Sequence, residues 1–266
     1  MMPHAQDVLT EAYAPIQSIF SSVQGEGPYV GHRQLFVRFA HCHLKCRYCD
    51  TPMMSATGQC HWEKNAGSGD ETLIENPISQ ALFHQLLLTA WGKVRHHSVS
   101  LTGGEPLLYH RFLANSLPEL VHQGLRFYLE TSGTQPLFLK EVLPWLSVIA
   151  MDIKLPSATG EAADFENQAD FYRLAVSESD RKAQTFIKLI FEHTIPDDEL
   201  AAIRDIVRHA DTPIFLQPMT LPEDSENPSP RLACSARELF RLIDVLQGHF
   251  HQVRVVPQTH KLLNIL

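Results

Sequence analysis

The sequence lacks the features that mark membrane, secreted and nucleic-acid-binding proteins. No apolar run approaches the ~20 residues needed to span a bilayer. Residues 1–15 contain no basic stretch followed by an apolar core, so we expect no secretory signal and a cytoplasmic protein. Lys and Arg total 22 against 30 Asp and Glu, a formal charge of −8. Because no basic run is present either, we expect neither nucleic acid nor a membrane as a partner.

The sequence also lacks a Gly-, Ser- or Pro-rich linker, so we expect a single domain over residues 1–266, with a core starting at about residue 16. Runs rich in β-branched and aromatic residues alternate with helical patterns, which predicts an α/β fold with a mainly parallel sheet, either open or curled into a barrel. The predicted strands are 33–40, 97–101, 126–131, 147–154, 184–191, 212–219 and 252–258.

Helix boundaries are marked by capping residues and glycine. One helix is predicted to begin at Asn76–Pro77 and another to cover about 111–122 before Gly124. Two more are predicted after Pro196 and over 235–247. Residues 55–76 and 157–183 are polar and without clear period, so we expect two inserted loops there.

Polar segments that contain glycine or proline follow several predicted strands. "TGGEP" (102–106), "TSGT" (131–134) and "QPMT" (217–220) each come directly after a β-rich run. Since the carboxyl ends of parallel strands are where α/β proteins place their active sites, these segments predict a site at that edge.

The five cysteines are few, but three of them lie within "HCHLKCRYCD" (41–50). An odd count in a protein expected to be cytoplasmic argues against a disulfide scaffold. The C-x3-C-x2-C spacing leaves three interpretations open. It could form a zinc site completed by His41, His43, Cys60 or His61, a redox dithiol at Cys46–Cys49, or three ligands of a [4Fe–4S] cluster with one open iron.

Two motifs in order resemble the radical S-adenosylmethionine (SAM) superfamily: the cysteine triad with Tyr48 before its last member, and "TGGEP" in the next turn after a strand. The flanking segments "QGEG" (24–27), "CDT" (49–51), "ETSGT" (130–134), "LQPM" (216–219) and "QTHK" (258–261) are similar to those of 7-carboxy-7-deazaguanine synthases. The resemblance implies a partial (β/α)6-type barrel with a [4Fe–4S] cluster, SAM and Mg²⁺ as cofactors.

The resemblance also implies a reaction. Members of that family convert 6-carboxy-5,6,7,8-tetrahydropterin to 7-carboxy-7-deazaguanine with loss of ammonia, a carbon–nitrogen lyase step in the biosynthesis of 7-deazapurines such as queuosine. A 5′-deoxyadenosyl radical takes hydrogen from C6 of the pterin, the ring contracts, and SAM is regenerated. The implied partners are the pterin, a flavodoxin- or ferredoxin-like electron donor, and a second copy of the chain in a homodimer.

Site residues follow from the resemblance position by position. The cluster ligands are Cys42, Cys46 and Cys49, and the Mg²⁺ ligand is Thr51. The substrate contacts are Val23, Gln24, Gly25, Glu26, Arg38, Thr102 and the terminal carboxylate of Leu266. The SAM contacts are Tyr48, Cys49, Asp50, Gly104, Ser132, Asp152, Ile153, Lys154, Gln217, Pro218, Met219 and Thr220. The chain departs from the family pattern at Asn264 and Leu266, and at Asp152, where some members carry serine.

Other functions and structural explanations remain open at this point. A radical activating enzyme would use the same cluster to place a glycyl radical on a partner protein, and a zinc-stabilised binding module would need no radical chemistry. Glu26 and Arg38 could form an ordinary surface ion pair. Trp62, in the first inserted segment, is a candidate lid residue.

Overall fold

The computed structural model describes residues 11–49, 58–177, 183–221, 231–263 and 265. A ten-stranded sheet dominates it, with strand order β14-β11-β10-β9-β8-β7-β3-β2-β4-β5. The strands from β14 to β3 run parallel to one another, while β2 lies antiparallel to β3. The fold is therefore α/β with a large, mostly parallel sheet, as the sequence predicts.

The strands of this sheet are β2 (Ile16–Val23), β3 (Arg33–Phe39), β4 (Gln59–Glu63), β5 (Glu71–Glu75), β7 (Val99–Gly103), β8 (Phe127–Thr131), β9 (Leu146–Asp152), β10 (Gln184–Phe191), β11 (Ile214–Pro218) and β14 (Val253–Val255). Two short pairs lie outside it, β1 (Tyr13–Ala14) with β6 (Ile78–Ser79) and β12 (Thr220–Leu221) with β13 (Arg231–Leu232). The α-helices are α2 (Gln80–Lys93), α3 (His110–His122), α4 (Pro136–Val142), α5 (Pro156–Thr159), α6 (Phe165–Val176), α7 (Asp197–Ile206), α8 (Ala236–Gln247) and α9 (Thr259–Leu263).

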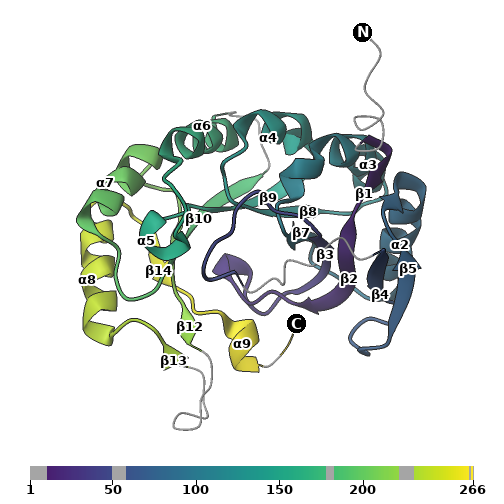
Figure 1. Ribbon diagram of the computed structural model, residues 1–266, viewed down its shortest axis with the longest axis horizontal. Helices are drawn as coiled ribbons and strands as arrows, with labels where there is room; N and C mark the ends of the chain where they lie inside the picture. The colour runs from purple at the N-terminus through teal and green to yellow at the C-terminus, as the bar shows by residue number, and fades with distance from the viewer. Residues whose placement is uncertain (1–10, 50–57, 178–182, 222–230, 264, 266) are drawn as a thin grey trace.

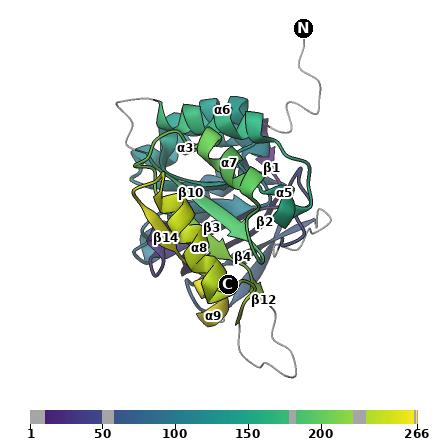
Figure 2. The same cartoon turned by 90° about the vertical axis from the view of Figure 1, so that its left-hand side faces the viewer.

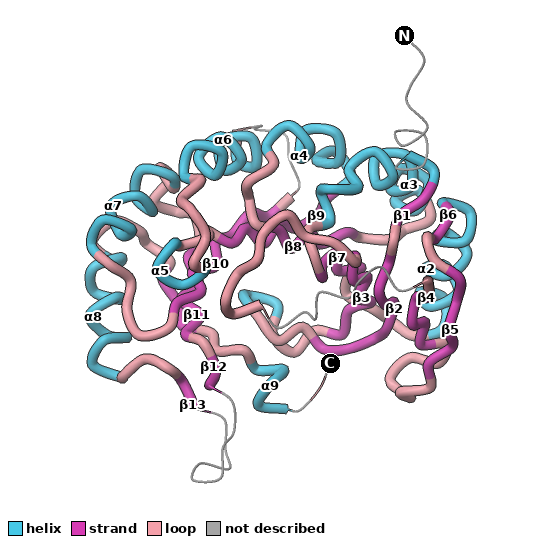
Figure 3. Tube along the Cα trace, in the orientation of Figure 1, coloured by secondary structure: helices cyan, strands magenta, loops and turns pink. Residues whose placement is uncertain are grey.

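The sheet is curved, and its two faces differ (Figure 1). The outside of the arc is covered by a succession of helices, α2, α3, α4, α6, α7 and α8. Figure 2 shows α7 and α8 towards the viewer on that outer side. Loops lie on the inside of the arc, together with α9 near the C-terminus (Figure 3). No helix in the described ranges is both long and apolar enough to cross a bilayer.

The inner face of the sheet carries a small apolar cluster and, nearer the carboxyl ends of the strands, polar side chains. Tyr128, Val148, Ala150, Phe186 and Phe215 form a separate buried cluster there. Nearer the carboxyl ends, the parallel register aligns Arg38 with Thr102 and Asp152 with Lys188. Because aligned residues of neighbouring strands point to the same face, successive strands deliver polar groups to one edge of the arc.

Most predicted elements are confirmed, with one helix start wrong. All seven predicted strands are present, and Gly124, with φ +88°, follows α3 as expected for a glycine just past a helix end. The helix predicted from Asn76–Pro77 instead begins at Gln80, because the hydroxyl of Ser79 accepts a hydrogen bond from the Leu82 amide and caps it.

The two expected loops are also corrected. Within 55–76, residues from Gln59 onward form the β4–β5 hairpin, which extends the sheet beyond β2; residues 55–57 lie outside the described residues. Residues 157–183 contain most of α5 and all of α6, the helical connection from β9 to β10 that a parallel pair requires. Polar composition hid both: β5 is largely exposed, and α6 buries only one stripe.

Candidate active site

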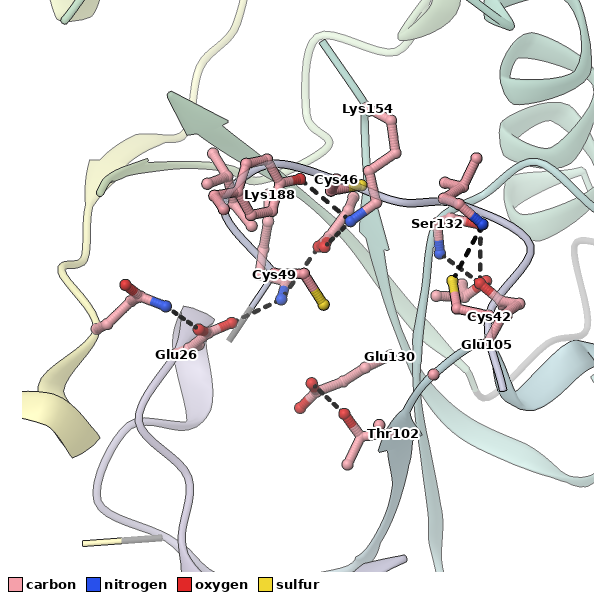
Figure 4. A pocket seen from close by; sticks show the side chains of 18 of the residues that line it. Glu26, Cys42, Cys46, Cys49, Thr102, Glu105, Glu130, Ser132, Lys154 and Lys188 are labelled. Atoms are coloured by element: carbon pink, nitrogen blue, oxygen red, sulfur yellow. Dashed lines mark hydrogen bonds and ion pairs between the residues drawn. The ribbon is translucent and has the colours of Figure 1, made fainter. Parts of the chain in front are cut away.

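A pocket opens at the carboxyl ends of the parallel strands, inside the arc. It contains about 930 Å³ of space not filled by protein atoms, part of it open to solvent. Figure 4 shows that side chains from the cysteine loop and from several strands point into it. The lining residues are Glu26, Ala40, Cys42, Leu44, Cys46, Tyr48, Cys49, Thr102, Gly103, Gly104, Glu105, Glu130, Thr131, Ser132, Asp152, Lys154, Lys188, Ile190 and Gln258.

The three clustered cysteines share this pocket, and none of them forms a disulfide with a described residue. They lie on the loop after β3, and the Cys49 amide donates a hydrogen bond to the Cys46 carbonyl at 3.0 Å. Burial raises the pKa of the Cys42 and Cys46 thiols. Among the described residues, no three His, Cys, Asp or Glu side chains converge closely enough to hold a single metal ion. The triad lines one shared space.

A Gly-Gly turn holds the cysteine loop from behind. Gly103 has φ +97°, which side chains disfavour, and a Cβ on Gly104 would lie 1.9 Å from the His41 carbonyl oxygen. The Gly104 amide donates to the Phe39 carbonyl at 2.9 Å, and the Glu105 amide donates to the His41 carbonyl at 2.7 Å. Only glycine permits this backbone contact, so the turn fixes where the loop leaves β3.

Glu105, the next residue in the chain, is buried, and both of its carboxylate oxygens accept hydrogen bonds. Its Oε1 accepts from the Thr131 hydroxyl at 2.8 Å and from the Leu107 amide at 3.2 Å. Its Oε2 accepts from both the amide and the hydroxyl of Ser132, each at 2.8 Å. A buried carboxylate with four donors is well satisfied, and this one ties the turn after β7 to the turn after β8.

On the β9 side, Asp152, Lys154 and Tyr48 form a buried polar group. The Lys154 ammonium lies 2.9 Å from Asp152 Oδ2 and donates to the Tyr48 hydroxyl at 3.2 Å. Burial raises the pKa of Tyr48 to about 12. Burial opposes ionisation of Asp152, but Lys154 and Lys188 hold the pKa of its carboxyl below the ordinary value.

Glu26 projects into the pocket from the loop after β2. Its Oε2 lies 2.7 Å from the Lys188 ammonium, while its Oε1 accepts from Gln217 Nε2 at 2.8 Å and Gln258 Nε2 at 3.4 Å. Lys188 also lies 3.0 Å from Asp152 Oδ1. The chain of charges Glu26–Lys188–Asp152–Lys154 thus crosses the pocket wall (Figure 4).

Glu130 is a second carboxylate on the wall, at the end of β8. It accepts from Gln24 Nε2 and the Thr102 hydroxyl, both at 2.9 Å, and from the Ser100 hydroxyl at 3.3 Å. Gln24 Oε1 in turn accepts from the Glu26 amide at 3.0 Å. The "QGEG" segment is therefore bonded through side chains to the neighbouring strands.

The structure brings ten of the predicted site residues together in this pocket. They are Glu26, Cys42, Cys46, Tyr48, Cys49, Thr102, Gly104, Ser132, Asp152 and Lys154. The residues that do not line it are Val23, Gln24, Gly25, Arg38, Ile153, Gln217, Pro218, Met219 and Thr220. Asp50, Thr51 and Leu266 lie outside the described residues.

Two structural explanations from the sequence are corrected. Glu26 pairs with Lys188, and the Arg38 guanidinium lies 4.8 Å from the centre of the Phe20 ring, so no Glu26–Arg38 ion pair forms. Trp62 is half-buried on β4 and packs against the core instead of covering the pocket.

Three charged residues of the lining are not among the predicted site residues. They are Glu105, Glu130 and Lys188. Lys188 had a usable signal, because a lysine inside the apolar run "FIKLIF" is rarely buried without an acidic partner. Glu105 and Glu130 lie within the motifs "TGGEP" and "ETSGT", in which only a glycine, a threonine and a serine were predicted to contact ligands.

An α/β sheet with a polar, charged pocket at the carboxyl ends of its strands defines the class as an enzyme acting on a small molecule. No protein-family model matches the chain. The chain is 36% identical over 258 aligned residues to the 7-carboxy-7-deazaguanine synthase of Geobacter sulfurreducens, covering 95% of this chain and 98% of the relative. It is 31% identical to the synthase of Methanothermobacter thermautotrophicus, covering 95% and 98%. The chain belongs to the 7-carboxy-7-deazaguanine synthase family.

A solved structure supports the fold. The crystal structure of QueE from Escherichia coli superposes with a TM-score of 0.56 at 18% identity, covering 96% of this chain and 99% of that one. At that identity the likeness establishes the shared architecture, while the sequence relatives establish the family.

Proposed function

We propose that this protein converts 6-carboxy-5,6,7,8-tetrahydropterin to 7-carboxy-7-deazaguanine with loss of ammonia, as a radical SAM lyase of 7-deazapurine biosynthesis. The observation that carries the proposal is the convergence of Cys42, Cys46 and Cys49 on a pocket that also holds the "QGEG" carboxylate Glu26. A relative named 7-carboxy-7-deazaguanine synthase, 36% identical over 95% of this chain, supports the same reaction.

The residues present fit a [4Fe–4S] cluster. The three thiols line one space and none forms a disulfide with a described residue, and thiolates of cysteine are the usual ligands of such a cluster. Cys42, Cys46 and Cys49 would hold the cluster, and with SAM it would supply a 5′-deoxyadenosyl radical. Mg²⁺ prefers oxygen ligands, and the Thr51 hydroxyl, outside the described residues, would provide one.

The chain's own residues would orient SAM beside the cysteine loop. The half-buried Gly103–Gly104 turn lines the same pocket, so its backbone would contact a ligand there. Ser132, fixed by Glu105, presents a hydroxyl to the same space, and Lys154 presents a cation. A SAM molecule carries both a carboxylate and hydroxyl groups, which suit a lysine and a serine. Asp50, Asp152, Ile153 and the 217–220 segment would complete this side.

The substrate side would lie towards β2, β3 and β7. Glu26 and the backbone of Val23–Gly25 would read the amino-pyrimidinone edge, which presents donors and acceptors together. Thr102 would add a hydroxyl contact, and Arg38 would meet the substrate carboxylate with its planar guanidinium. The terminal carboxylate of Leu266 is a further proposed contact.

The remaining parts of the proposal concern the protein as a whole. The six strands β3, β7, β8, β9, β10 and β11 would form the partial (β/α)6-type barrel, all within a single domain. The active form would be a cytoplasmic homodimer, and a flavodoxin- or ferredoxin-like protein would deliver the electrons. The curved sheet and its outer helices support the barrel (Figure 1).

The experiment is an anaerobic turnover assay of the reconstituted protein with the tetrahydropterin, SAM, Mg²⁺ and a reductant, with the product identified by mass. We expect 7-carboxy-7-deazaguanine and release of ammonia, both abolished in Cys46→Ala. Cys234→Ala is the matched control, because Cys234 is buried away from the pocket. Reductive cleavage of SAM with unchanged pterin would overturn the substrate and favour an activating enzyme. A colourless protein with stoichiometric zinc would overturn the radical chemistry.

A further inference from the structure

Lys188 is the most buried cation of the pocket wall. It stands in the middle of β10 and its residue is 3% exposed, while its neighbours Ile187 and Leu189 belong to the main apolar core. A buried ammonium is costly unless it is paired, and Lys188 is paired twice, with Glu26 at 2.7 Å and Asp152 at 3.0 Å. Figure 4 shows the ion pair between Lys188 and Glu26 as a dashed line.

The two carboxylates depend on Lys188 unequally. Asp152 keeps the Lys154 ammonium at 2.9 Å, whereas within the described part of the chain Lys188 is the one cation at ion-pair distance from Glu26. The glutamines that bond Glu26 are neutral and cannot balance its charge. Loss of Lys188 would therefore leave the half-buried Glu26 carboxylate with neutral partners.

The charged groups that face Lys188 are carboxylates. The groups that face it are Asp152 from β9, Glu26 from the loop after β2, and Glu130 and Tyr128 from β8. Burial alone would lower the pKa of Lys188, but Asp152, then Glu26 and Glu130, raise it well above the ordinary lysine value. The ammonium stays charged over the whole working range of pH.

We propose that Lys188 is a positioning residue that holds the Glu26 carboxylate aimed at the pterin, and couples it to the Asp152–Lys154 pair on the SAM side. A charge-assisted hydrogen bond fixes the direction of a carboxylate more firmly than neutral partners do, and the remaining lone pairs of the Glu26 oxygens can then accept from an amino group of the substrate. Lys188 acts on the substrate through Glu26. This inference rests on the proposed function.

The test measures pterin binding in reconstituted enzyme with SAM, using the fluorescence of 6-carboxypterin as probe. In Lys188→Met we expect affinity at pH ~7 to fall about tenfold or more, the scale of a charge-assisted hydrogen bond. Lys188→Arg, which keeps the cation, should recover part of that affinity.

Two further variants keep the outcome decisive. Lys188→Met with Glu26→Gln removes both charges, so binding should stay weak, and this neutral pair should fold even if Lys188→Met alone does not. Lys93→Met, on the exposed end of α2, should match the wild type. If Lys188→Met binds like wild type, the inference is overturned while the proposed function stands. If wild type itself binds no pterin, the proposed function falls first.

Discussion

Replacing Gly104 with alanine tests the contact on which the cysteine loop depends. The new methyl group would lie 1.9 Å from the carbonyl oxygen and 2.4 Å from the carbonyl carbon of His41. Both atoms belong to backbone, so no side chain can rotate away. To reach the 3.4 Å of an ordinary contact, the loop has to retreat by about 1.5 Å, an overpacking that typically costs about 1–3 kcal/mol.

The same displacement breaks hydrogen bonds. The amides of Gly104 and Glu105 bond to the Phe39 and His41 carbonyls, and each such bond contributes about 0.5–1.5 kcal/mol. We therefore expect Gly104→Ala to lower the free energy of unfolding by about 3 kcal/mol, measured by urea unfolding of the metal-free protein followed by circular dichroism. Iron bound after reconstitution should fall as well, because Cys42 moves with His41.

The control is Gly92→Ala. Nothing lies within 4 Å of a Cβ at Gly92, near the end of α2, so this alanine should stabilise the protein by about 0.5–1 kcal/mol. If Gly104→Ala unfolds at the wild-type urea concentration and binds the same iron, the close approach of the two turns is refuted. Stability unchanged with iron lost would instead mean that the loop moves alone at small cost.

Three more predictions concern other parts of the molecule. Gly25→Ala would place a Cβ 2.7 Å from the His260 backbone nitrogen, so we expect the C-terminal segment to detach and to be cut faster in limited proteolysis, and an unchanged cleavage rate would contradict this. The pKa of folded Asp152 lies below its ordinary value of about 4, so this residue contributes stability that is present above that pH and lost as pH falls through the folded pKa. In urea unfolding at a series of pH values, the free energy of unfolding of Asp152→Asn should therefore fall less steeply towards acid pH than that of the wild type. An equally steep fall would refute the contribution of Asp152. Ser79→Ala should cost about 1 kcal/mol in the same assay through loss of the α2 cap, unless Leu82 finds another acceptor.

The parallel core of the fold was predictable because its strands bury both faces. Runs such as 186–191 are apolar except for Lys188, and helices with clear caps separate them, so strand, helix and order follow from composition and from capping residues. The β4–β5 hairpin was not predictable in the same way. Strand β5 lies at an edge with Leu73 about half exposed, and its pairing with β4 gives a polar segment its structure.

The site was predictable where glycines and cysteines set its chemistry, and less so where strands did. Spacing alone indicates that Cys42, Cys46 and Cys49 act together, and the pocket confirms that they share one space. The partners of Glu26 could not be read locally, because Lys188 lies 162 residues away along the chain. Which strands become neighbours decides such pairs, and that information is spread over the whole sheet.

This separation along the chain has a consequence for how the protein is made. Glu26 is bonded to Gln217, 191 residues later, and to Gln258, 232 residues later, so its surroundings are complete only when nearly the whole chain has left the ribosome. Contacts of such long range form late and slow the folding of a domain. The N-terminal half of the nascent chain therefore emerges with its cysteines and Glu26 already present but without the last walls of the pocket. Ligand binding can reward folding only at the end of synthesis, so chains truncated before β14 should be cleared as unfinished protein.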